Sequence, residues 1–68
     1  MKLETLKKGQ TIIAKKDLFR IDGHYFPKDM MFTIISNDIE IQTTKQAEDK
    51  YGRTIRICNQ SIKNFKYA

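Results

Sequence analysis

The sequence predicts an all-β fold, a small barrel of about five strands with one short helical turn near the C-terminus. Two observations support the β class. Short runs rich in β-branched residues occur at 10–15 and 53–58. Glycines at 9, 23 and 52 separate segments of different character, as turn residues do. No repeat or linker interrupts the 68 residues, which predicts a single domain, 1–68.

The N-terminal part contains the first expected strand. Leu3 and Leu6 have an i, i+3 spacing that ends at Gly9, which fits either one helical turn or an irregular strand. Residues 10–15 are too short for a helix and rich in isoleucine and threonine, so we expect a strand there.

The dipeptide Asp22-Gly23 predicts a β-hairpin with a two-residue type I′ turn. That turn pairs Arg20 with Tyr25. It also pairs Ile21 with His24 and Phe19 with Phe26. Because side chains alternate along a strand, four residues should face inward: Phe19, Ile21, His24 and Phe26. Arg20 and Tyr25 should then lie exposed together.

A second hairpin is expected at 30–44, turning at Asn37-Asp38. This register puts four apolar residues on the inner face: Phe32, Ile34, Ile39 and Ile41. The pairs would be Ser36 with Ile39, Ile34 with Ile41, and Phe32 with Thr43. Thr33, Glu40 and Gln42 fall on the outer face, with Met31 and Ile35 as apolar exceptions.

The C-terminal third contains a polar connection followed by another strand. Residues 44–52 are polar and link to the strand 53–58, in which Ile55 and Ile57 should point inward. Asn59 or Ser61 caps a helical turn carrying Ile62 and Phe65. For the last residues of the chain, the sequence does not distinguish a final strand from an irregular tail. So small a sheet must curl to bury its apolar face, which predicts closure into a barrel.

Two segments resemble those of the SH3-like barrels found in short bacterial and phage proteins. Residues 6–14, Leu-Lys-Lys-Gly-Gln-Thr-Ile-Ile-Ala, are similar to the start of such domains, with a glycine before the first strand. Residues 26–35 resemble the end of their first long loop and the next strand. The resemblance implies binding of peptides, of nucleic acids or of a neighbouring domain, and does not choose among them.

Charge and cysteine content limit the class of protein. Thirteen Lys and Arg against eight Asp and Glu give a net charge of +5, which favours encounters with nucleic acid or acidic proteins. Cys58 is the only cysteine, so no internal disulfide forms, as is usual in a reducing cytosol. No signal-peptide or membrane-spanning apolar run is present, and we expect a cytoplasmic location.

Catalytic, metal and cofactor sites are not expected. His24 and Cys58 provide at most two of the four ligands of a structural zinc site, and nothing in their spacing places them together as a catalytic pair. The aspartates at 17, 22 and 29 lack the spacing of a calcium loop. So short a chain has little room to enclose a small-molecule cavity, so we expect a non-catalytic protein without cofactor.

The leading hypothesis is a binding module for RNA or single-stranded DNA. Cationic side chains neutralise phosphates and aromatic rings stack on bases. The candidate residues are Arg20, Tyr25, Tyr51, Arg53, Arg56, Lys15 and Lys16. A simpler interpretation is that Arg20 covers the Tyr25 ring and that the lysines keep the protein in solution.

The alternative function is that of a phage-type accessory or inhibitor protein that docks on a larger host or viral protein. The apolar exceptions Met31 and Ile35 are the candidate interface. An equal alternative is that Leu3 and Leu6 of the N-terminal segment cover these two side chains. Self-association into a homodimer through this face would also support a small core.

Overall fold

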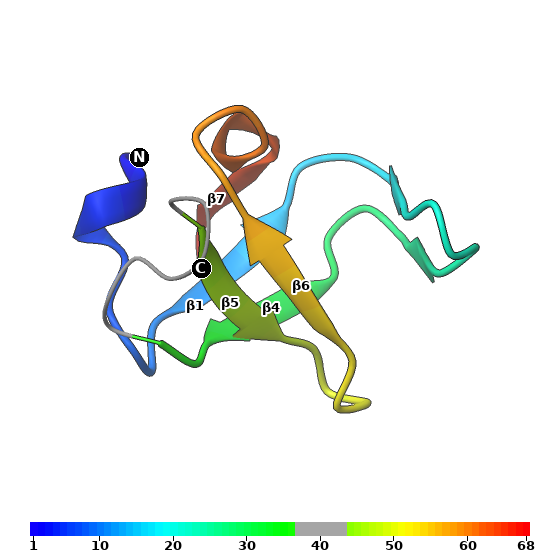
Figure 1. Cartoon of the computed structure of the whole chain (residues 1–68), viewed down its shortest axis with the longest axis horizontal. Coiled ribbons are helices and arrows are strands. Elements are labelled where there is room, and N and C mark those ends of the chain that lie inside the picture. The colour runs from blue at the N-terminus through cyan, green and yellow to red at the C-terminus, as the bar shows by residue number, and fades with distance from the viewer. Residues whose placement is uncertain (37–43) are drawn as a thin grey trace.

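The fold consists of short strands and two 3-10 turns (Figure 1). The computed structural model describes residues 1–36 and 44–68. A 3-10 turn, η1, spans Leu3–Thr5, and another, η2, spans Ile62–Asn64. The strands are β1 Thr11–Ala14, β2 Leu18–Phe19, β3 Tyr25–Phe26, β4 Met31–Ile34, β5 Lys45–Glu48, β6 Thr54–Ile57 and β7 Phe65–Tyr67. The expected all-β class is therefore confirmed. No helix in the described ranges is long and apolar enough to cross a membrane.

Five strands form an antiparallel sheet in the order β6-β5-β4-β1-β7, and β2 and β3 form a separate two-stranded sheet. The strands β5 and β6 run across β1 and β4, so the larger sheet folds over on itself (Figure 1). The bend follows from the short β4–β5 ladder, which pairs only Thr33 with Glu48 and Ile34 with Ala47. Within the described residues no sheet is closed, since β6 and β7 remain its two edges, so the expected barrel closure is not confirmed.

The core lies between the two halves of the folded sheet. Phe32 is its centre, because its ring lies 5.4 Å from that of Phe26 and 5.9 Å from that of Phe65. Alternation in β1 and β4 buries Ile12, Ala14, Phe32 and Ile34, while the intervening residues face outward. Leu3, Leu6, Ala47, Ile57 and Ile62 complete the buried cluster.

The N-terminal segment packs against the core as a 3-10 turn, which settles the choice left open by the sequence. Leu3 and Leu6 are both buried. Lys45, itself buried, reaches across and donates a hydrogen bond from Nζ to the Leu6 carbonyl. A lysine without an acceptor at this depth would be costly, so this contact fixes the position of the segment.

The first hairpin has a different register from the one expected. Leu18 pairs with Phe26, and Phe19 pairs with Tyr25. The loop contains three residues, 21–23, closed by a 2.9 Å hydrogen bond from Arg20 N–H to the His24 carbonyl. Gly23 has φ of 90°, but Asp22 does not have the positive φ that a type I′ turn requires.

The additional loop residue reverses the predicted faces of β2 but not those of β3. Phe19 and Ile21 are exposed instead of inward, and Leu18 packs on the core in place of Phe19. Phe26 is buried as expected. The predicted side-by-side placement of Arg20 and Tyr25 is also wrong, because Tyr25 lies opposite Phe19. A shift of one residue exchanges the two faces of a strand.

The second hairpin is confirmed only for its first strand. Phe32 and Ile34 are buried, and Thr33 and Met31 are exposed, as expected. Its proposed turn and the partners at 39–43 lie outside the described residues. In the described structure Ile34 pairs with Ala47 of β5. The expectation that 44–52 is only a connection is therefore wrong, since Lys45–Glu48 is a central strand.

The C-terminal segment follows the prediction and extends it. Ile57 is buried and Ile55 packs on the core at its margin, while Thr54 and Arg56 face outward. The turn η2 buries Ile62, and Phe65 follows it into the core. The Ser61 side chain does not cap this turn; its Oγ accepts a hydrogen bond from Cys58 N–H instead. The last residues form β7, which pairs with β1.

Candidate functional site

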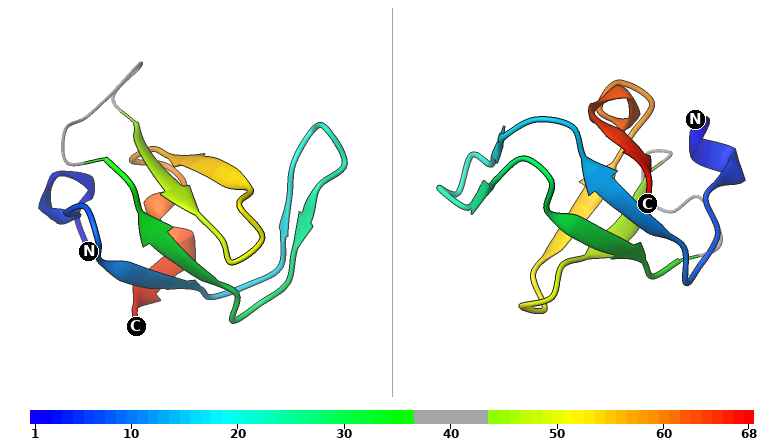
Figure 2. Two further views of the ribbon diagram at one scale, coloured as in Figure 1. Left: turned by 90° about the horizontal axis from the view of Figure 1, so that it is seen from below. Right: turned by 180° about the vertical axis from the view of Figure 1, so that it is seen from behind.

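The β2–β3 hairpin stands away from the larger sheet (Figure 2), and a groove lies at its base. This groove has a volume of about 400 Å³. We call it the basic groove; it is lined by Lys16, Asp17, Leu18, Phe19, Arg20, Phe26, Ile55, Arg56, Ser61, Asn64 and Phe65. Three of the predicted cationic residues, Lys16, Arg20 and Arg56, therefore come together against one carboxylate, Asp17.

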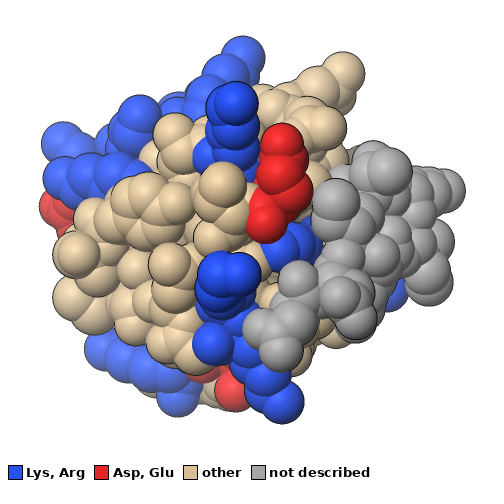
Figure 3. Space-filling view, turned by 90° about the vertical axis from the view of Figure 1, so that its left-hand side faces the viewer, with Lys and Arg blue, Asp and Glu red and all other residues tan. Residues whose placement is uncertain are grey.

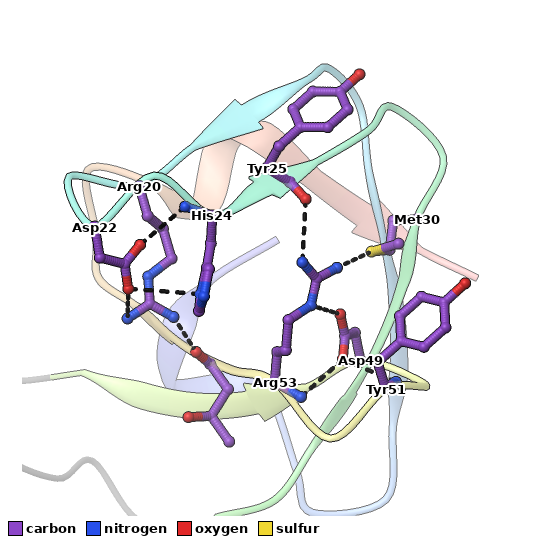
Figure 4. Close-up of polar contacts among 9 residues, drawn as sticks. Arg20, Asp22, His24, Tyr25, Met30, Asp49, Tyr51 and Arg53 are labelled. Atoms are coloured by element: carbon purple, nitrogen blue, oxygen red, sulfur yellow. Dashed lines mark hydrogen bonds and ion pairs between the residues drawn. The ribbon is translucent and has the colours of Figure 1, made fainter.

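Arg20 links the hairpin to the edge of β6. Its Nη1 donates to the Thr54 carbonyl at 2.6 Å, and its Nη2 lies 3.2 Å from Asp22 Oδ2 (Figure 4). The hydrogen bond from His24 N–H and the charge of Arg20 lower the pKa of Asp22. Because this ion pair is about half exposed, it is weak, and another anion can compete for the guanidinium.

Arg56 comes from the outward face of β6, opposite Gln46 on β5. A second hollow, lined by Arg20, Gln46, Thr54, Ile55 and Arg56, continues the basic groove along this strand. Lys16 lies at the start of the hairpin, just after β1. Lys16 after β1, Arg20 in the hairpin and Arg56 on β6 therefore lie around one concave surface.

Phe19 lines the hairpin wall of the basic groove and packs against Tyr25, a predicted site residue that lies outside the groove lining. The rings of Phe19 and Tyr25 are 5.0 Å apart and tilted by 30°. The partial burial of Tyr25, together with a hydrogen bond and charge repulsion from Asp17, raises the pKa of its phenol. Asp17 also accepts a hydrogen bond from Lys28 N–H at 2.7 Å, so its carboxylate fixes the base of the hairpin.

Tyr51 and Arg53 lie outside the basic groove, at the turn between β5 and β6. Arg53 Nε donates to Asp49 Oδ2 at 2.8 Å, and its guanidinium lies 4.4 Å from the centroid of the Phe26 ring. Figure 4 shows this guanidinium enclosed by Asp49, Met30 and the Tyr25 carbonyl. Arg53 is thus engaged in contacts that hold the turn on the core.

The remaining candidate residues, Lys15, Met31 and Ile35, lie at different places in the fold. Lys15 is exposed, and its N–H binds the Asn64 carbonyl between β1 and η2. Met31 is 56% exposed on β4, as expected. Ile35 is half-buried beside β5, where its N–H donates to the Gln46 carbonyl. The two apolar exceptions therefore differ in exposure.

Lys and Arg side chains are spread over the face that carries the N-terminal segment (Figure 3). They surround uncharged surface, and acidic groups lie among them. The positive charge is therefore not gathered into one patch on this face. Concavity together with charge, rather than charge alone, singles out the basic groove as the candidate site.

His24 and Cys58 have separate partners. His24 Nδ1 lies 3.5 Å from Asp22 Oδ2, whereas Cys58 Sγ lies 3.5 Å from Ser61 Oγ. Hydrogen bonding to Ser61 lowers the pKa of the Cys58 thiol. Across the described parts of the chain, no three His, Cys, Asp or Glu side chains gather as metal ligands.

Sequence reasoning predicted only the three cations of the groove lining; it missed Phe19 and Ile55, among others, because both were assigned to the interior. A signal was present in the sequence. Ile21-Asp22-Gly23 has glycine third, like Lys50-Tyr51-Gly52, and both are three-residue loops with a positive φ at the glycine. Such a loop places Phe19, not Arg20, opposite Tyr25.

The chain was compared with protein-family models, curated proteins and solved structures. None of the three comparisons finds a match. The function must therefore be argued from the basic groove itself.

Proposed function

We propose that this chain is a non-catalytic binding module that contacts nucleic acid through the basic groove. The observation that carries the proposal is the convergence of Lys16, Arg20 and Arg56 on one hollow whose walls also present an aromatic ring. Phosphates need cations, and exposed bases need apolar surfaces, so this combination fits a nucleic-acid strand.

We also propose that the module is an SH3-like barrel. The strand order β6-β5-β4-β1-β7 and the hairpin between β1 and β4 support this assignment. The 3-10 turn η2 directly before the last strand supports it as well. In this architecture the basic groove lies between the long first loop, residues 15–30, and the turn η2.

The charge balance of the groove favours a polyanion over a neutral ligand. Among the described residues, Asp17 is the only acidic one in its lining, and its carboxylate accepts a hydrogen bond from Lys28 N–H. Arg20 and Arg56 both line the groove and its extension along β6. A strand that follows this path would meet two guanidinium groups in succession, which are well suited to phosphate.

The test is oligonucleotide binding by an Arg20→Gln, Arg56→Gln variant. Labelled single-stranded RNA, single-stranded DNA and duplex are titrated at two salt concentrations. The control, Lys2→Gln, Lys7→Gln, removes the same charge from exposed positions on the N-terminal segment. We expect the groove variant to bind at least about tenfold more weakly, with the slope of log K against log salt reduced by about two.

An equal loss in both variants would reduce the interaction to general charge attraction and overturn the proposal. Because Arg20 also binds the Thr54 carbonyl, thermal denaturation must show that the variant is folded. Lys16→Gln, Arg56→Gln removes two groove charges without touching that hydrogen bond, and it should weaken binding similarly. Unchanged binding in every groove variant would overturn the proposal and favour a protein partner at Met31.

A further inference from the structure

Phe19 is a large aromatic residue that does not pack into the core. Its side chain is 77% exposed, although it lies next to Leu18, which packs on the core. Apart from its contact with Tyr25, most of the Phe19 side chain is therefore accessible to a partner.

The surroundings of Phe19 hold its ring in place. It pairs with Tyr25 across the hairpin, and the two rings lie 5.0 Å apart at 30°. The backbone carbonyl of Tyr25 accepts a hydrogen bond from Arg53, which links this strand to the turn between β5 and β6. A pre-positioned ring loses little conformational entropy when a planar group stacks on it.

Cations lie on the same concave surface. Phe19 and Arg20 both line the basic groove together with Arg56. The charge of this surface is complementary to a phosphate backbone, and its apolar wall suits the face of a base. In a duplex the base faces are covered by their neighbours, whereas an unpaired strand exposes them.

We infer that the basic groove takes single-stranded nucleic acid, with one base stacked on Phe19 and the adjacent phosphates on Arg20 and Arg56. This inference rests on the proposed nucleic-acid function and adds the class of strand. Asp22 limits the affinity, because its carboxylate occupies the Arg20 guanidinium that a phosphate would bind.

The direct probe is a Phe19→Trp variant, because the chain contains no tryptophan. Titration with a single-stranded DNA oligonucleotide should quench the new fluorescence, since a stacked base quenches an indole. A Tyr51→Trp variant is the matched control, because Tyr51 is also exposed but lies outside the groove. Its fluorescence should stay unchanged at the same saturation.

Phe19→Leu gives the energetic counterpart by keeping an apolar side chain and removing the ring. We expect single-strand affinity to fall by about 5- to 150-fold, the range that one stacked base supplies, with an unchanged salt slope. Duplex affinity should hardly change. Asp22→Asn removes the partner of Arg20 and should strengthen single-strand binding more than Asp29→Asn, which makes the same charge change on an exposed loop.

The outcomes separate the two proposals. If the unmodified protein binds no nucleic acid above the level of general charge attraction, the proposed function fails. If it binds through Arg20 and Arg56 but Phe19→Leu retains full affinity and the Phe19→Trp signal is not quenched, the function stands and the stacking inference is overturned.

Discussion

In the turn between β5 and β6, Arg53 Nε donates a 2.8 Å hydrogen bond to the buried carboxylate of Asp49. The other oxygen of that carboxylate accepts the N–H groups of Tyr51 and Arg53 at 3.0 and 2.9 Å. The guanidinium also covers the Phe26 ring. One buried aspartate therefore organises the turn and fastens it to the core.

Asp49→Asn should destabilise the fold by about 1–3 kcal/mol at neutral pH, because the amide keeps an acceptor for the backbone but loses the charge that pairs with Arg53. Urea denaturation measures the difference. Asp29→Asn is the control, since it removes a carboxylate from an exposed loop position. An equal effect of the two substitutions would contradict the role of Asp49.

The contribution of Asp49 should depend on pH. Burial alone would raise its pKa, but the hydrogen bonds and charge of Arg53 outweigh burial and hold the pKa below the ordinary value. A carboxyl with a lowered folded pKa stabilises fully above the unfolded pKa, about 3.9, and loses this effect as pH falls through the folded pKa. The stability difference between the native protein and Asp49→Asn should shrink below about pH 4. A difference that stays constant in acid would refute this.

Arg53→Lys should separate stability from binding. Lysine keeps the charge but cannot reproduce the planar contact with Phe26 and the directed bond to Asp49, so we expect a loss of about 1 kcal/mol in thermal or urea denaturation. Oligonucleotide affinity of the folded variant should change by less than about twofold, because Arg53 lies outside the basic groove. A larger loss of affinity would place Arg53 in the binding surface after all.

The register of the first hairpin can be tested by a disulfide. Phe19 and Tyr25 face each other next to the bonded Arg20–His24 pair, so they occupy a position where Cα atoms lie about 4.5 Å apart. In a Cys58→Ser background, Phe19→Cys with Tyr25→Cys should oxidise readily, as that spacing allows. Arg20→Cys with Tyr25→Cys, the pair expected from the two-residue turn, should oxidise slowly. Thiol titration after mild oxidation distinguishes them.

Lys45→Met should loosen the N-terminal segment. Methionine replaces the aliphatic chain but leaves the Leu6 carbonyl without the ammonium donor. We expect faster hydrogen exchange at Leu6 N–H, which bonds to Leu3, than in the unmodified protein, with little change in β1 and β4. Lys66→Met, at an exposed position of β7, serves as the control. Equal exchange in both variants would show that the buried lysine does not hold the segment.

The sequence predicts correctly those parts of the fold that depend on the alternation of inward and outward side chains within one strand. Phe32 and Ile34 in the second predicted hairpin and Ile57 in 53–58 face the core as expected, and 10–15 contains the expected strand. The strand at β5 escaped prediction because its inward residues are Lys45 and Ala47, which give no apolar alternation. Lys45 is accommodated inside only because the Leu6 carbonyl accepts its hydrogen bond.

The sequence by itself determined the β class, the inward faces of β4 and β6 and the set of cationic residues available to a partner. Only the tertiary structure decided that Lys16, Arg20 and Arg56 share a groove while Arg53 joins the core. The reason is physical: side-chain alternation is local, whereas a groove depends on hairpin register and strand order. One additional loop residue between Arg20 and His24 turned Phe19 out of the core and into the candidate site.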